Sequence, residues 1–249
     1  MLDLAFAGLQ RGRLRLSISI FTSNEELTKL TRGLLWETIA YVKLAASFQV
    51  SVTGWPRDVA ILVGNVVRLT KLLLGIDHLA FSKMEDVLNL TIPLAVETIV
   101  DLKYLLENGD AKLLDSYVGI PSKKGSKTRI GWADLDLKQK AEATGFRDVY
   151  ADALQDAPFY LHGSWKDLTE NHLSPAGNER YRVKPVSTEL NPRPLIAVSI
   201  LTIDVIYDFS HVLGNGPAVE KLQNALKDLY SRLKIADEEF ARSLYTRWY

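Results

Sequence analysis

Apolar residues that recur at steps of three and four constrain the fold of this chain more than any other feature. Behind residue 23 the stripe consists of Leu27, Leu30, Leu34, Tyr41, Leu44 and Phe48. Its one gap lies at Glu37. This spacing puts the apolar side chains on one face of an α-helix, so we predict a long amphipathic helix that ends near Val50. Ser23 and Glu26 have the spacing of a capping box at its start.

The same periodicity predicts further helices, whose ends are marked by glycine and proline. Pro56 stands at the first position of a helix that we expect to stop at Gly75. A capping box over residues 82–85 predicts the start of a third helix, which Pro93 should kink or divide before it ends at 108–109. The remaining predicted helices cover residues 110–117, 135–144, 147–161, 165–172, 195–213 and 217–245.

These elements predict an all-α fold, a single helical-bundle domain of about six to nine helices over residues 1–249. Residues 121–129 have loop composition and are the one candidate boundary inside the chain. The helices on both sides of this loop have apolar faces that would be buried most simply against each other. Residues 174–194 hold four prolines and a glycine and indicate a long surface loop, with a brief strand near 181–186 as an alternative.

Composition narrows the class of protein. The chain has no cysteine, which excludes disulfides, thiolate metal sites and cysteine nucleophiles. Its 30 basic and 30 acidic residues give a net charge of zero, so nucleic-acid binding is not supported by net charge, although the basic clusters at 11–15 and 123–129 could contact phosphates. The N-terminal residues lack the order of a secretory signal. We therefore expect a cytoplasmic protein.

The most apolar helix, residues 195–213, carries Asp204, Asp208 and His211 at steps of four and three. A membrane span would rarely contain three such groups, so we predict a buried core helix and no membrane association. Charged residues also interrupt the apolar faces of the other long helices, at Glu37 and at Glu97 with Asp101 one turn later.

Carboxylates on core faces are costly to bury unless they are paired, and two interpretations follow. In the first, Arg68 and similar cations pair with Glu37 or Glu97 inside the bundle, and Asp204 and Asp208 face solvent along a narrow strip. In the second, Glu37, Asp101, Asp204 and Arg68 line a polar cavity that binds a ligand.

We expect no cofactor, and a bound divalent metal is the alternative. Asp208 and His211 have the carboxylate-x-x-His spacing of a di-metal helix, but neither Glu37 nor Glu97 has a histidine three residues on. A mononuclear site would combine Asp208 and His211 with His162. His162 is also a candidate general acid or base, with Glu97 as its candidate catalytic partner, or a structural residue in the last turn of a helix.

The run from Tyr160 to Leu173 contains His162-Gly163-Ser164 and follows a helix that carries Glu97. In these features the chain resembles, over roughly residues 60 to 215, a bacterial family of all-helical proteins of unassigned activity. More distantly it resembles the HEPN helical domains of bacterial toxins and antiviral systems, which cleave or bind RNA. The HEPN signature is an arginine followed by four to six residues and a histidine, and none of the four histidines here has an arginine at that distance.

Our leading interpretation is a prokaryotic interaction or accessory protein without demonstrable catalysis, and the resemblance implies its link to a defence or toxin system. The alternative function is a hydrolase or nuclease, with or without a metal, that has its polar site in the bundle; whether the chain is an enzyme is left open. A protein partner or a second copy is expected, since the aromatic run Tyr245-Thr246-Arg247-Trp248-Tyr249 suits an interface.

Overall fold

The computed structural model describes residues 24–48, 54–82, 84–118, 135–148, 173–177, 180–183 and 191–245. These residues form seven helices and one two-stranded hairpin, so the predicted all-α helical bundle is confirmed. The candidate boundary at 121–129, His162 and most of the predicted helices at 147–161 and 165–172 lie outside the described residues.

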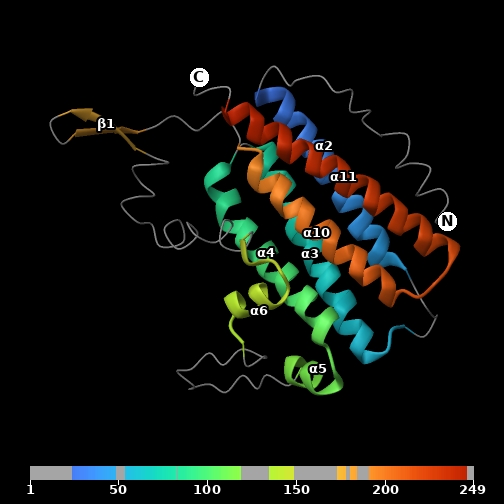
Figure 1. Cartoon of the computed structure of the whole chain (residues 1–249). Coiled ribbons are helices and arrows are strands. Elements are labelled where there is room, and N and C mark those ends of the chain that lie inside the picture. The colour runs from blue at the N-terminus through green and yellow to red at the C-terminus, as the bar shows by residue number, and fades with distance from the viewer. Residues whose placement is uncertain are drawn as a thin grey trace, which may run out of the picture.

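Four helices make up the central bundle: α2 (Asn24–Ser47), α3 (Arg57–Phe81), α4 (Glu85–Asn108) and α10 (Arg193–Val212). Each packs on two others, in the closed order α2, α3, α4, α10 and back to α2. The long helix α11 (Pro217–Tyr245) covers the side of the bundle formed by α10 and α2 (Figure 1). This arrangement places α10 between α2, α4 and α11, which agrees with its prediction as a core helix.

Two short helices complete the described bundle. α5 (Ala111–Val118) begins after Asp110, whose carboxylate accepts a hydrogen bond from the Leu113 amide at 2.7 Å, and it contacts the lower ends of α3 and α4 (Figure 1). Its Tyr117 hydroxyl donates to Asn65 Oδ1 of α3 at 3.1 Å. α6 (Leu137–Ala143) packs on α4 and begins with a complete capping box between Asp136 and Gln139.

The predicted loop at 174–194 contains an antiparallel hairpin of β1 (Leu173–Gly177) and β2 (Arg180–Val183). A strand near residues 181–186 was the alternative prediction, and β2 overlaps its first half. The pairing strand β1 had no signal in the sequence because it contains both a proline and a glycine, which ordinarily argue against a strand.

The helix ends differ from their predictions at the α3–α4 connection. α3 continues through Gly75 to Phe81, because Ile76 and Ala80 beyond the glycine are buried in the core. Their burial offsets the cost of about 1 kcal/mol for a glycine inside a helix. Helix α4 likewise runs undivided through Pro93.

The predicted capping box over residues 82–85 was wrong. Ser82 closes α3, where its amide donates to the His78 carbonyl at 3.0 Å, and the Met84 amide donates to Leu79 at 3.0 Å. Met84 is the N-cap of α4 and provides no side-chain hydrogen bond. The Ser-x-x-Glu spacing therefore coincides with a chain reversal in which the backbone satisfies the last carbonyls of α3.

Two helices are long and apolar enough to cross a membrane by length and composition alone, α3 and α10. In the most apolar window of α10, 61% of the residues are buried inside the protein, and in that of α3 the share is 44%. Core helices of soluble proteins have the same length and composition.

Replacing Gly109 at the end of α4 with alanine is expected to lower the free energy of unfolding by about 1–3 kcal/mol. A Cβ atom at this position would lie 2.2 Å from the backbone oxygen of Leu105, so the last turn of α4 would have to shift. Gly216→Ala is the matched control, because a Cβ there meets nothing within 4 Å. Urea denaturation of both variants measures the difference, and equal losses would contradict the steric explanation.

Candidate functional site

The described carboxylates on core-facing positions are held mainly by cations from other helices. One enclosed pair joins Glu37 of α2 to Arg232 of α11, whose side chains are each 12% exposed. The guanidinium donates to both carboxylate oxygens, Nη1 to Oε2 at 2.8 Å and Nη2 to Oε1 at 2.5 Å. Burial opposes the charge of Arg232, but the hydrogen bonds that it donates to Glu37 outweigh this effect and raise the pKa of the guanidinium. Two parallel bonds fix α11 against α2.

Arg68, which we predicted as the partner of Glu37, does not pair with it. Arg68 is exposed on the outer face of α3 and makes no ion pair with a described residue. The preceding polar residue of that helix, Asn65, is the buried one, and its amide donates to the Ile61 carbonyl at 3.0 Å.

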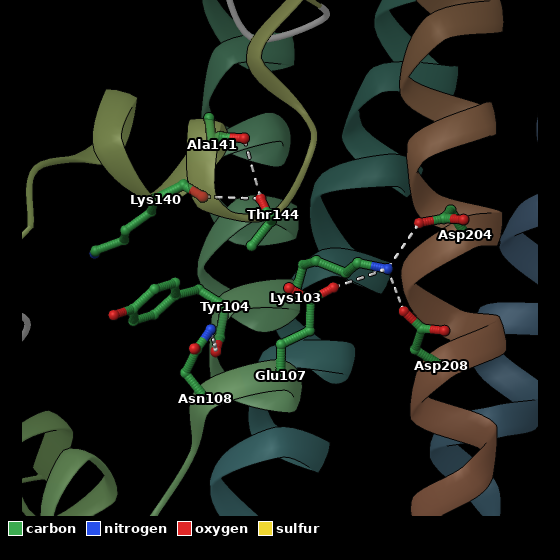
Figure 2. Close-up of polar contacts among 9 residues, drawn as sticks. All are labelled: Lys103, Tyr104, Glu107, Asn108, Lys140, Ala141, Thr144, Asp204 and Asp208. Atoms are coloured by element: carbon green, nitrogen blue, oxygen red, sulfur yellow. Dashed lines mark hydrogen bonds and ion pairs between the residues drawn. The ribbon is translucent and has the colours of Figure 1, made fainter.

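A second cluster forms where α4 meets α10, and Lys103 is its centre (Figure 2). The Lys103 ammonium donates to Asp208 Oδ2 and, at 3.1 Å, to Asp204 Oδ2, and lies 3.4 Å from Glu107 Oε1 one turn along its own helix. Asp204 and Asp208 are four residues apart on α10, so they lie on one face and can reach the same ammonium. The ring of Phe146 lies 5.6 Å from the Lys103 nitrogen.

Lys103 is much less exposed than the acids around it, at 12% against 41% for Asp204 and 34% for Asp208. Burial of the Lys103 side chain disfavours its charged form, but hydrogen bonds to Asp208 and Asp204 more than offset this. The net effect raises the pKa of Lys103 above its ordinary value of 10.5. The ammonium is therefore fixed in its charged form at every physiological pH.

Lys103→Met is expected to lower the free energy of unfolding by about 1–2 kcal/mol at neutral pH, since it leaves two neighbouring carboxylates without their cation. Because the pKa of Lys103 is higher in the folded chain, its contribution is complete below pH 10.5 and declines as the pH rises above that value.

The contribution is measured as the difference in unfolding free energy between wild type and Lys103→Met at pH 7, 9 and 11. The titration of other groups cancels in this difference. A difference that grows between pH 9 and pH 11 would contradict the assignment. Lys71→Met, at an exposed position on α3, is the control for loss of one positive charge.

A third pair joins Asp101 of α4 to Lys140 of α6, with 2.8 Å between Nζ and Oδ1. The two side chains are 13% and 6% exposed. In Figure 2 the Lys140 side chain extends away from the Lys103 cluster. Asp101 and Lys103 are two residues apart on α4, so the two pairs lie on different faces of this helix. The backbone carbonyl of Lys140 accepts a hydrogen bond from Thr144 at 2.9 Å, which closes the end of α6.

The candidate metal ligands Asp208 and His211 have different neighbours. Asp208 is bonded to Lys103, whereas His211 is exposed, packs edge-on against Tyr207 and has its Nδ1 3.4 Å from the Gln223 amide nitrogen. No group of three or more histidine, cysteine or acidic side chains with metal-site geometry occurs among the described residues. A metal site would need a further ligand, and the candidate for it, His162, lies outside the described residues.

Of the candidate catalytic pair, only Glu97 is described. It is half-buried on α4, one turn before Asp101, and makes no ion pair with another described residue. The structure thus brings Asp204 together with Asp208, and places Glu37, Asp101 and Arg68 at separate points of the bundle.

Sequence reasoning missed the three cations that organise these clusters, Lys103, Arg232 and Lys140. One signal was present for Arg232, which stands inside the apolar stripe of α11 between Leu229, Leu233 and Ala236, all fully buried. Long basic side chains usually lie along an apolar surface with the charge in water, so a lysine or arginine on an amphipathic helix is ordinarily assigned to solvent.

The chain matches no protein-family model, and no curated protein and no solved structure shows significant similarity to it.

Proposed function

We propose that this chain is a helical interaction module that binds a protein partner in the cytoplasm and performs no reaction at its core-facing carboxylates. One observation carries the proposal: Asp204 and Asp208, the acids on the most apolar helix, share the ammonium of Lys103. A general base or a metal ligand needs a lone pair directed at substrate or metal. Here the Oδ2 oxygen of each carboxylate accepts a hydrogen bond from a lysine, as in a structural ion pair.

The surface that supports binding is a strip of exposed apolar side chains on α4, formed by Met84, Val87 and Leu94. Steps of three and seven residues put them on one helix face, and the exposed Phe81 lies just before them at the end of α3. Exposed apolar residues gathered in this way mark an interaction surface more often than scattered ones do.

We assign the strip on α4 to a second copy of this chain. The 30 basic and 30 acidic residues leave no net charge, so two copies do not repel each other. A strip that pairs with itself across a two-fold axis closes the assembly at a dimer, the commonest form of soluble oligomer.

Sedimentation velocity at micromolar concentration tests this assignment. Wild type should sediment as a dimer, and Leu94→Glu as a monomer, because the substitution puts two like charges at the centre of the interface. Ile235→Glu is the control, since Ile235 on α11 is 47% exposed and Leu94 is 46% exposed. A monomeric wild type, or a dimer that persists in Leu94→Glu, would contradict the proposal.

Metal content separates this proposal from the alternative of a metal-dependent hydrolase or nuclease. The alternative requires near-stoichiometric metal in protein purified without chelator, and loss of that metal in His211→Ala. Our proposal requires mass spectrometry to find no stoichiometric metal in either sample. The prokaryotic setting, with its link to toxin or defence systems, is proposed from the HEPN-like resemblance alone.

A further inference from the structure

A pocket of about 290 Å³ opens between α10 and α11, away from the strip on α4. Ile203 of α10 and Leu226 of α11 form its apolar part, and both are buried. Tyr207 and Tyr230 line it from the two facing helices. Pockets that bind small molecules begin at about 300 Å³ and combine apolar walls with a few polar groups, so this one suits a ligand of amino-acid size.

Two opposite charges line the same pocket without neutralising each other. Asp204 comes from α10 and Lys227 from α11, and no ion pair joins them. Asp204 is turned towards Lys103 through its Oδ2 atom, whereas the Lys227 ammonium lies over the Tyr207 ring, 5.3 Å from its centre. Within the described part of the chain, Lys227 has no carboxylate partner.

We infer that this pocket binds a small zwitterion with an apolar side chain, which is the chemistry of a hydrophobic α-amino acid. The ligand carboxylate pairs with Lys227 on one wall, and the ligand ammonium pairs with Asp204 on the other. Its apolar side chain lies between Tyr207 and Tyr230, above the buried Ile203 and Leu226. A ligand with only one of the two charges can form only one of these two ion pairs.

Isothermal titration with three probes that share the same phenylethyl group tests the inference. L-phenylalanine carries both charges, 2-phenylethylamine lacks the carboxylate and 3-phenylpropanoate lacks the ammonium. L-phenylalanine should bind at least about five-fold more tightly than either of the others, a difference typical of one partly exposed charge pair.

Lys227→Gln should remove this advantage, because the variant keeps most of the length of the side chain and loses its charge. Lys227 is exposed, so the variant is expected to fold normally. Lys71→Gln on α3 loses the same charge away from the pocket and should keep the preference. Absence of L-phenylalanine binding, equal binding of the three probes, or an equal loss in both variants would overturn the inference.

The two proposals fail separately. Sedimentation of Leu94→Glu reports on α4 alone, and titration of Lys227→Gln reports on the pocket between α10 and α11 alone.

Discussion

Arg232→Met is expected to lower the free energy of unfolding by about 3 kcal/mol, and with it the melting temperature by roughly 6–12 °C. The substitution keeps the length of the apolar stem but leaves the Glu37 carboxylate, which is 12% exposed, without its cation. Water cannot replace two hydrogen bonds at a position so little exposed, so most of the desolvation cost of the carboxylate becomes a loss of stability.

Arg242→Met on the same helix is the matched control. Arg242 forms ion pairs within α11, to Glu238 and Glu239, and its side chain is 68% exposed. Exposed pairs of this kind contribute about 0–1 kcal/mol. If thermal and urea denaturation gave equal losses for the two arginine variants, the enclosed pair would have no special role.

Lys140→Met is expected to cost about 2–3 kcal/mol by the same mechanism, since Asp101 is 13% exposed and would remain charged. This variant should also release α6 from α4, because the pair of Asp101 and Lys140 joins these two helices. The substitution should therefore accelerate amide hydrogen exchange more in α6 than in α2, which the pair does not touch.

Asp101→Asn in the Lys140→Met background should recover part of the lost stability, because it removes the unpaired charge. Lys138→Met is the control within α6, at an exposed position two residues before Lys140. Equal effects of the two lysine variants on α6 exchange would show that the helix is not held by this ion pair.

The long helices could be predicted from the sequence because burial against several neighbours imposes a strict period of 3.6 residues. The helix ends at the α3–α4 connection could not be predicted in this way. Gly75 and the spacing of Ser82 and Glu85 are local signals, whereas the observed ends depend on the burial of Ile76 and on backbone hydrogen bonds around the turn. Such contacts exist only after the helices have packed.

The candidate site divides in the same way. A carboxylate on an apolar face stands out in a sequence, so Glu37, Asp204 and Asp208 could be found. Their partners could not, because Lys103 lies about a hundred residues from its acids and Arg232 lies 195 residues from Glu37. The sequence alone does not show which distant residues lie close in space. Arg68 was therefore predicted as a partner, whereas the structure shows that it is exposed.

The measurement that tests the central claim most directly is a double-mutant cycle on Glu37 and Arg232. If the core-facing acids are structural ion pairs, Glu37→Met and Arg232→Met should each destabilise the fold, and the double variant should lie within about 1 kcal/mol of wild type. The coupling energy would then be about 2 kcal/mol or more. Additive losses in the double variant would contradict the account, because they would mean that Glu37 and Arg232 serve separate roles.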